Sequence, residues 1–472
     1  MFILKKCLLR SAVLCIAITM FFALTTGCKS TPTVSSSSSS SSVSENTKKV
    51  DFGGKEVIFT YPWPLATPES SSAAERADKK RQDLEKQYNV KITNKSVNGN
   101  YYSAKMVSSI LSGKPMGSFL VCPGIYTADY FKSEIFTDLT AAMEETKINF
   151  EDPLRYNQHV LQYTNLNGKQ IGLNSGYPGL TDIWVFNKRM LAEANIDIYK
   201  IFDDGQWTFD KVEEIAKLLT KDTDNDGVTD VYGLGTQMTE FLAFSLSVSN
   251  GGSMMKIDPK SNLPVLSWND PASREALNTM YKWSVTDKIL GFSKGGAWTQ
   301  GATDFANGKY AIIQCSIDYL STLRSIPMKD EYGIVGTPKG PKTKGGYVSA
   351  TYNMSFSFIP VTYQNDAANL LVLFDALNIS SKQSWLDSTE PLVCDEESLK
   401  NMGDILFTPD RLVFEPSTVF GIEWAEPSFA MCIQDICVNN QTVGAAIDKY
   451  STQFVSLIND KWKDIKFTGD FN

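Results

Sequence analysis

The stretch from Ser118 to Cys122 reads SFLVC, and every residue after the serine is apolar. A short apolar run without polar alternation is typical of a strand that is buried on both faces of a parallel sheet. Upstream, 55–60 (KEVIFT) predicts a first strand, 73–88 a charged helix and 90–92 a second strand. A predicted helix over 103–111 then leads into SFLVC. Strands that alternate with helices in this way predict an α/β fold.

The same alternation continues downstream of this stretch. Strand 183–186 (IWVF) precedes a helix over 187–194. Thr208 is suited to cap the next helix, whose apolar residues recur at helical spacing: Phe209, Val212, Ile215, Ala216 and Leu219. A buried helix is expected over 367–377 and an amphipathic one over 447–462. Ligands of such sheets bind beyond the carboxyl ends of strands, so we look for a site in the loops that follow them.

The chain opens with a targeting signal. Three basic residues within the first ten positions precede an apolar run over 11–24, and small residues then lead to Cys28. This order is typical of a secretory signal peptide over 1–27, and the apolar run is too short for a membrane span. The cysteine resembles the lipid-attachment site of bacterial lipoproteins, although Thr25 stands where those signals usually carry leucine. We expect Cys28 to carry a diacylglycerol; the alternative is an ordinary signal with a chance cysteine.

Residues 28–49 form a predicted disordered tether, because eight consecutive serines offer no apolar surface to bury. Removal of 1–27 takes away three basic and no acidic residues, so the formal net charge changes from −8 to −11. An acidic chain lacks the basic surface that nucleic-acid binding requires. The residues beyond the tether suffice for two domains with their own cores.

The cysteines do not form a disulfide framework. Five remain beyond Cys28, an odd number at irregular spacing: Cys122, Cys315, Cys394, Cys432 and Cys437. Cys432 and Cys437 could pair, but buried free thiols are expected for most. His159 is the single histidine, which argues against a histidine-built zinc site and against a Ser-His-Asp hydrolase. No G-x-x-x-x-G-K-[ST] loop is present, so any ATP hydrolysis belongs to a partner.

Six stretches, in this order, carry a resemblance to a known family. They are 83–92 (DLEKQYNVKI), Tyr177 with 185–196 (VFNKRMLAEANI), 207–220 (WTFDKVEEIAKLLT), 232–234 (YGL), 305–313 (FANGKYAII) and 333–340 (GIVGTPKG). Together they resemble the extracellular solute-binding proteins of family 1, the maltose-binding-like sugar receptors of ABC importers. The resemblance spans nearly the whole chain beyond the tether.

The resemblance implies a two-lobed periplasmic-binding-protein-like α/β fold of type II, with a ligand cleft between lobes joined by crossing strands. The N-terminal lobe is expected over 51–180 plus 303–351, and the C-terminal lobe over 181–302 plus 352–472. The crossings are expected near 179–182, near 299–303 and near Tyr352.

The implied function is that of a lipid-anchored, monomeric receptor on the outer side of a cell membrane. It would capture a carbohydrate, with an oligosaccharide favoured, by hinge closure and deliver it to the transmembrane subunits of an ABC permease. No catalysis is expected.

Aromatic side chains in loops beyond predicted strands supply candidate sugar contacts. Sugars present apolar C–H faces that pack on aromatic rings, while carboxylates accept their hydroxyl hydrogens. The candidate ligand residues are Tyr61, Trp63, Tyr126, Tyr177, Trp298, Asp318, Tyr319, Tyr352 and Trp424. Any one of the aromatic residues could instead belong to the core or to an inert surface.

The most specific local motif is DTDNDGVTD over 222–230. Its oxygen ligands, its glycine and its spacing match the start of an EF-hand calcium loop. We expect calcium to be held structurally by Asp222, Asp224, Asp226, the Val228 carbonyl and Asp230. Gly233 occupies position 12, where an EF-hand has a bidentate glutamate, so no switching EF-hand is expected. The alternative is an acidic loop that binds nothing.

Two other classes of function stay open from the sequence. A lipid-anchored enzyme acting on glycosides would need two closely spaced carboxylates in one cleft. A calcium-dependent surface adhesin would need the metal loop and no small-molecule pocket.

Overall fold

The computed structural model describes residues 49–63, 65, 72–97, 102–152, 155–174, 180–293, 299–352, 355–378, 382–422 and 427–471. The predicted signal peptide, Cys28 and the tether up to residue 48 lie outside these ranges. Among the helices that are described, none combines the length and the apolarity needed to cross a bilayer.

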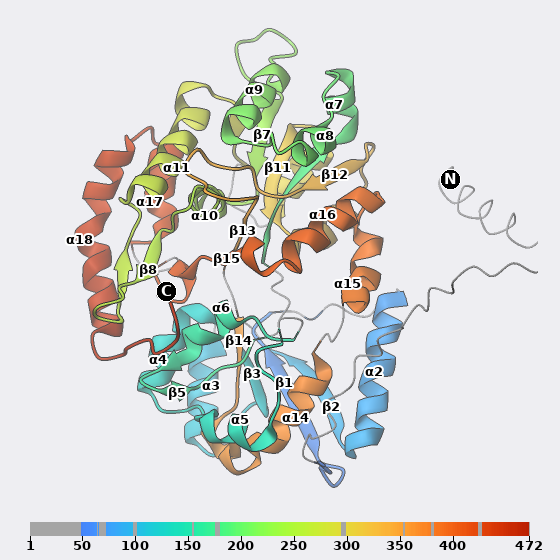
Figure 1. The fold of residues 1–472 in the computed structure, drawn as a ribbon, viewed down its shortest axis with the longest axis vertical. Coiled ribbons are helices and arrows are strands. Elements are labelled where there is room, and N and C mark those ends of the chain that lie inside the picture. Colours follow the sequence, from blue (N-terminus) through green and yellow to red (C-terminus); the bar gives the residue numbers. More distant parts are fainter. Residues whose placement is uncertain are drawn as a thin grey trace, which may run out of the picture. The chain divides into compact units, whose positions relative to one another are not determined.

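The first lobe is built on a four-stranded sheet of order β14-β3-β1-β2. Its strands are β1 (Glu56–Tyr61), β2 (Lys91–Ser96), β3 (Phe119–Pro123) and β14 (Ser355–Phe358). The predicted strands β1, β2 and β3 run parallel, and β14 runs antiparallel to β3. Its helices are α2 (Ser72–Tyr88), α3 (Tyr102–Leu111), α4 (Thr127–Lys132), α5 (Thr140–Thr146), α6 (Gln158–Leu161) and α14 (Ala367–Leu377) (Figure 1). The rings of Phe59 and Phe119 stack at 4.5 Å in its core.

The second lobe contains a five-stranded sheet of order β10-β7-β11-β6-β12. The strands are β6 (Asp182–Asn187), β7 (Tyr232–Thr236), β10 (Leu290–Gly291), β11 (Tyr310–Ser316) and β12 (Tyr332–Val335). Strands β7, β10 and β11 are parallel, while β6 runs antiparallel to both β11 and β12. Thr208 caps α9, as predicted, by accepting a hydrogen bond from the Lys211 amide at 3.3 Å.

Eleven helices among the described residues accompany this second sheet. The first six are α7 (Lys188–Glu193), α8 (Ile198–Asp203), α9 (Phe209–Leu219), α10 (Thr239–Ser249), α11 (Pro271–Tyr281) and α12 (Gln300–Ala306). The others are α13 (Tyr319–Ser325), α15 (Lys382–Thr389), α16 (Glu396–Leu406), α17 (Phe429–Cys437) and α18 (Val443–Trp462). Three two-stranded pairs complete the fold: β4 (Asn165–Leu166) with β5 (Lys169–Gln170), β8 (Met255–Ile257) with β9 (Pro264–Leu266), and β13 (Ser349–Thr351) with β15 (Leu412–Phe414).

The strand pairing corrects the expected division into lobes. Segment 303–351 was expected in the N-terminal lobe, but β11 and β12 both pair with β6 in the second sheet. Segment 355–378 was expected in the C-terminal lobe, but β14 pairs with β3 and α14 packs on α5. No crossing occurs near 299–303, because α12 packs on β7 and β11 of the same sheet. An apolar run in the sequence indicates that a strand is buried, but it does not indicate which strands lie beside it in the sheet.

The chain passes between the lobes three times, through two neighbouring segments and between α14 and α15. Thr181 and Thr351 form an antiparallel bridge, and the Tyr352 amide donates to the Leu180 carbonyl at 3.1 Å. The first segment leads into β6 and the second leads toward β14. These two neighbouring segments lie near 179–182 and near Tyr352, where the family resemblance implies crossings.

The C-terminal tail, residues 463–471, forms a further link between the lobes. It leaves α18 and runs to the β4–β5 hairpin of the first lobe (Figure 1). The Asn167 amide donates to the Lys466 carbonyl at 2.8 Å, and Thr468 donates through its amide to the Asn165 carbonyl at 3.1 Å. On the other side, the Phe467 amide donates to the carbonyl of Asn262 in the β8–β9 loop at 3.0 Å. The tail therefore bridges hairpins of both lobes.

Candidate functional site

The carboxyl edges of the two sheets are connected by the crossing segments. In the first sheet, Ser355 at the start of β14 pairs with Pro123 at the end of β3. In the second sheet, Asp182 at the start of β6 pairs with Ser316 at the end of β11. Each crossing thus reaches a sheet at the edge where its parallel strands end, which is the edge that binds ligands in α/β folds.

Predicted aromatic residues lie at this edge in the first lobe. Tyr61 ends β1, Trp63 follows it with 40% of its surface exposed, and their ring centroids are 6.0 Å apart. The Ser96 hydroxyl donates to the Trp63 carbonyl at 2.7 Å, which ties the loop after β1 to the end of β2. Tyr126 follows β3 and packs on Tyr130 at 5.8 Å. Since β1 and β3 are adjacent and parallel, all three predicted residues share one edge.

The second lobe presents polar groups at its corresponding edge. Asp318 follows β11, is solvent-exposed, and accepts a hydrogen bond from the Ser316 hydroxyl. Crowding by protein atoms raises the pKa of Asp318 to about 6, although its surface stays open to water, which screens the effect. Gln237 follows β7, and its Oε1 accepts a hydrogen bond from the Ser316 amide at 3.0 Å and lies 3.0 Å from the Ser316 hydroxyl oxygen. These contacts place Gln237 and Asp318 around one serine.

Sequence reasoning missed Gln237 and Glu240. Glu240 lies in the first turn of α10, is 2% exposed, and accepts from the Thr239 hydroxyl at 3.1 Å. Burial raises its pKa. Amides and carboxylates are frequent in this chain, so residue type alone does not mark them. The one available signal is their position directly after strand 232–236, at an edge where Trp and Tyr were sought instead.

Two predicted ligand residues belong to the core. Tyr319 is fully buried, and its hydroxyl accepts from the Ala302 amide at 2.7 Å. Tyr352 is also fully buried, with its ring 4.4 Å from that of Phe241. Both side chains are covered by their neighbours in this structure and contribute to packing. Three further predicted residues lie outside the described part of the chain: Tyr177, Trp298 and Trp424.

A buried carboxylate stands beside the crossing segments. Asp182 is fully buried, and its Oδ2 accepts from the Ser245 hydroxyl at 2.6 Å and from Trp184 Nε1 at 3.3 Å. Thr337 and Gln314 donate to it as well, and Gln314 Nε2 also lies 3.3 Å from the Tyr352 hydroxyl. Burial raises the pKa of Asp182 to about 7, while these four hydrogen bonds oppose the rise. The Asp182 carboxylate and its donors stabilise the start of β6, and they have no exposed surface that a ligand could contact.

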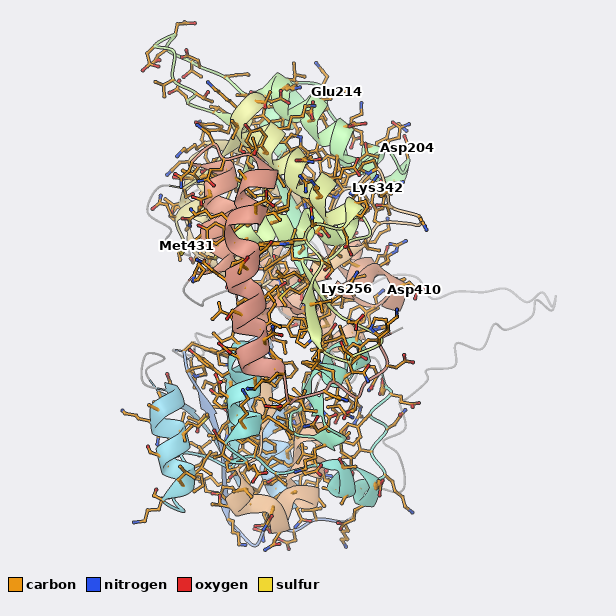
Figure 2. The ribbon with its side chains drawn as sticks, turned by 90° about the vertical axis from the view of Figure 1, so that its left-hand side faces the viewer. Asp204, Glu214, Lys256, Lys342, Asp410 and Met431 are labelled. Atoms are coloured by element: carbon orange, nitrogen blue, oxygen red, sulfur yellow. The ribbon has the colours of Figure 1, made fainter. Side chains whose placement is uncertain are left out.

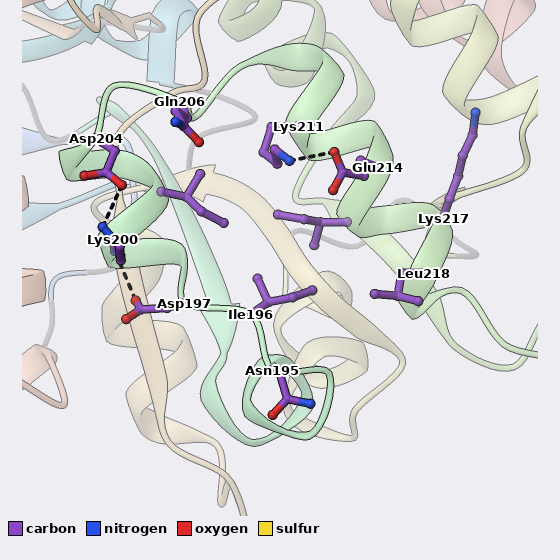
Figure 3. A pocket seen from close by; sticks show the side chains of 12 residues that line it. Asn195, Ile196, Asp197, Lys200, Asp204, Gln206, Lys211, Glu214, Lys217 and Leu218 are labelled. Carbon is purple, nitrogen blue, oxygen red and sulfur yellow. Dashed lines mark hydrogen bonds and ion pairs between the residues drawn. The ribbon is translucent and has the colours of Figure 1, made fainter.

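A cavity with a volume of about 720 Å³ lies elsewhere, between α8 and α9 (Figure 3). Its charged groups are mutually paired: Lys200 contacts Asp204 at 2.8 Å and Lys211 contacts Glu214 at 2.6 Å. Its lining residues lie between the end of β6 and the start of β7. Because β6 is antiparallel to the central strand β11 and β7 is parallel to it, the end of β6 and the start of β7 lie at the same edge of the sheet. The cavity is therefore at the edge away from the crossings, and we do not assign the site to it.

The acidic loop 222–230 brings three carboxylates together. One oxygen each of Asp222, Asp224 and Asp226 lie within 4.8 Å of one another, and all three side chains are exposed. Asp222 accepts from the amides of Asn225 and Gly227, both at 2.8 Å. Asp230 turns instead to Thr223, whose amide donates to its Oδ2 at 2.7 Å. Three convergent carboxylates fit a hard cation such as calcium.

The missing twelfth ligand has a steric cause. A Cβ atom on Gly233 would lie 2.1 Å from the Ala216 carbonyl oxygen of α9. The strand that follows the loop therefore packs directly on a helix backbone, and this position admits no side chain.

Charges of both signs are spread over the surface. Figure 2 shows acidic and basic side chains on the same side of the molecule, among them Asp204, Glu214, Lys256, Lys342 and Asp410.

The fold and the site define a binding protein with two α/β lobes joined by crossing segments. A family model described as bacterial extracellular solute-binding protein matches residues 80–373, so the chain belongs to this family. No curated protein sequence matches the chain.

Solved structures share the fold at low identity. The GacH receptor of Streptomyces glaucescens, solved with acarbose, is 16% identical with a TM-score of 0.59, covering 86% of this chain and 99% of that one. Lmo0181 of Listeria monocytogenes, solved with cycloalternan, is 17% identical with a TM-score of 0.60, covering 87% and 99%. UgpB of Mycobacterium tuberculosis, solved with glycerophosphocholine, is 14% identical with a TM-score of 0.62, covering 86% and 99%.

Proposed function

We propose that the protein captures a carbohydrate, with an oligosaccharide favoured, between its lobes and delivers it to an ABC permease. The observation that carries this proposal is the placement of Tyr61, Trp63 and Tyr126 at one carboxyl edge and of polar groups at the other, with the crossing segments joining both edges. Rings take the C–H faces of a sugar and polar groups take its hydroxyls. A ligand that contacts both lobes stabilises a closed state that a permease can recognise. Solved relatives with acarbose and cycloalternan support a sugar, and their role as receptors supports binding without turnover.

The ligand class is tested by a thermal-shift screen with acarbose, cycloalternan, maltotriose and simple sugars, with glycerophosphocholine as the non-sugar comparison. A sugar at about 100 times its dissociation constant should stabilise the protein by roughly 2.7 kcal/mol and raise the unfolding midpoint by a few degrees. Product analysis of the same samples should find the sugar unchanged. A shift with glycerophosphocholine alone, or consumption of the sugar, would contradict the proposal.

The anchoring proposal follows from the N-terminal sequence. We propose that Cys28 carries the lipid, that 28–49 is a loose tether, and that the lobes act as a monomer just outside the membrane. Membership of an extracellular family supports this side of the membrane.

We also propose that loop 222–230 binds calcium for stability. Calcium should raise the unfolding midpoint by a few degrees, and chelation should reverse the rise, because three exposed carboxylates repel one another without a cation. Replacing Asp222 and Asp226 by asparagine should abolish the rise. The matched control replaces Asp203 and Asp204 by asparagine and should retain it. An equal midpoint with calcium and with chelator would rule the metal out.

A further inference from the structure

The carboxamide of Gln237 is paired on one side only. The side chain is 6% exposed, and its Oε1 accepts a hydrogen bond from the Ser316 backbone amide at 3.0 Å. Its Nε2 is buried and has no hydrogen-bond partner in the part of the chain that the structure describes. A buried donor without a partner is uncommon in folded proteins, so this atom requires an explanation.

The orientation of this amide is fixed by chemistry. The Ser316 backbone N–H can only donate, so it must face the oxygen of the carboxamide. Exchanging Oε1 and Nε2 would set two donors against each other. The unpaired atom is therefore a donor, and a ligand must offer it an acceptor.

Ser316 also positions a hydrogen-bond acceptor, the carboxylate of Asp318. The Ser316 hydroxyl donates to Oδ1 of Asp318, whose carboxylate is open to solvent. An ionised carboxylate can only accept. Ser316 thus holds a fixed donor and a fixed acceptor at the carboxyl ends of β7 and β11, beside the crossing at Thr181, whose carbonyl accepts from the Ile317 amide at 2.9 Å.

We propose that Gln237 Nε2 and the Asp318 carboxylate form a donor–acceptor pair that selects neutral ligands with neighbouring hydroxyl groups. One hydroxyl oxygen accepts from Gln237, directly or through one enclosed water, and an adjacent hydroxyl donates to Asp318. Each sugar hydroxyl can do both, which a methyl ether or a deoxy position cannot. The negative charge of Asp318 disfavours phosphate- or carboxylate-bearing solutes at this position. This inference rests on the proposed carbohydrate receptor.

The test is isothermal titration of the full protein with the sugar that gives the largest thermal shift in the screen. Gln237→Glu keeps the acceptor toward Ser316 and turns the donor into an acceptor, so affinity should fall about tenfold or more. Asp318→Asn, an exposed substitution that does not endanger folding, should also lower affinity. The control Gln364→Leu, in an exposed segment of the first lobe, should bind as wild type.

The outcomes separate the two proposals. If no sugar shifts the wild-type protein, the receptor proposal fails and the pair fails with it. If wild type binds a sugar but both variants stay within twofold of its affinity, the donor–acceptor pair is overturned while the receptor function stands. Tighter binding of a phosphorylated analogue than of the parent sugar would also overturn the pair.

Discussion

Replacing Asp182 by alanine should lower the free energy of unfolding by about 3 kcal/mol or more, because four buried donors lose their acceptor at once. Ser245 and Trp184 donate to its Oδ2, and Thr337 and Gln314 also donate to the carboxylate. Asp182 is fully buried, so bulk water does not reach the donors that lose their acceptor. Urea unfolding followed by tryptophan fluorescence measures the loss.

The same carboxyl group makes stability depend on pH. Burial raises the pKa of Asp182 to about 7, so between about pH 4 and pH 7 the folded protein keeps a proton that the unfolded chain has released. The contribution of Asp182 protonation to the free energy of unfolding is fully present below pH 4 and is lost as pH rises through 7. Glu415, whose pKa is raised to about 7 by burial, acts in the same direction.

Wild-type protein should therefore be more stable at pH 5 than at pH 8, and Asp182→Asn should show a smaller difference. Asp204→Ala serves as the control, because its ion pair with Lys200 is exposed and contributes less than about 1 kcal/mol. An unchanged pH dependence in Asp182→Asn would mean that the carboxyl is ionised throughout this range.

Truncating Phe467 to alanine should cost about 3–5 kcal/mol, the usual range for a phenylalanine removed from a core. Its fully buried ring lies 4.8 Å from that of Trp462, 5.5 Å from Phe420 and 5.9 Å from Tyr163. Tyr163 belongs to the first lobe and the other two rings to the second. The substitution removes packing between the lobes as well as within one, and urea unfolding measures the loss.

Val455→Ala on α18 is the matched control, since this side chain is 47% exposed and should cost little. Small-angle scattering of the ligand-free protein adds a second measurement. If the tail restrains the lobes, Phe467→Ala should increase the radius of gyration under native conditions. A loss below 1 kcal/mol with unchanged scattering would show that the tail is dispensable.

Local sequence patterns predicted local structure well. The helix over 367–377 has the predicted bounds, and Thr208 caps α9 because a side-chain oxygen at that position has a nearby amide to accept from. Lobe membership failed at β11 and β14, because pairing depends on residues more than a hundred positions away. The crossings near 179–182 and Tyr352 were found only through the family resemblance.

The candidate site was partly predictable for a physical reason. The position of Trp63 and Tyr126 at one edge was predictable because loops after parallel strands meet there. The sequence also placed Tyr352 in a loop after a strand, but its ring packs on Phe241 and Phe244 in the core. The sequence pattern around an aromatic residue after a strand is the same whether the residue faces the core or a ligand. The sequence did not predict Gln237 as a site residue, because its distinguishing property, an unpaired hydrogen-bond donor, exists only in the folded protein.

We expect the contacts of residues 463–471 to form late in folding. Thr468 contacts Asn165 across a sequence separation of 303 residues, and Phe467 completes a cluster that already contains Tyr163. Contacts between residues this far apart in the sequence form late and slowly, because a long loop must close before they can form. A chain that emerges from its N-terminus therefore holds an unfinished first lobe, with apolar surface exposed, until its last residues arrive. Such a chain should depend on holding chaperones until then, more than a protein whose domains fold one after another.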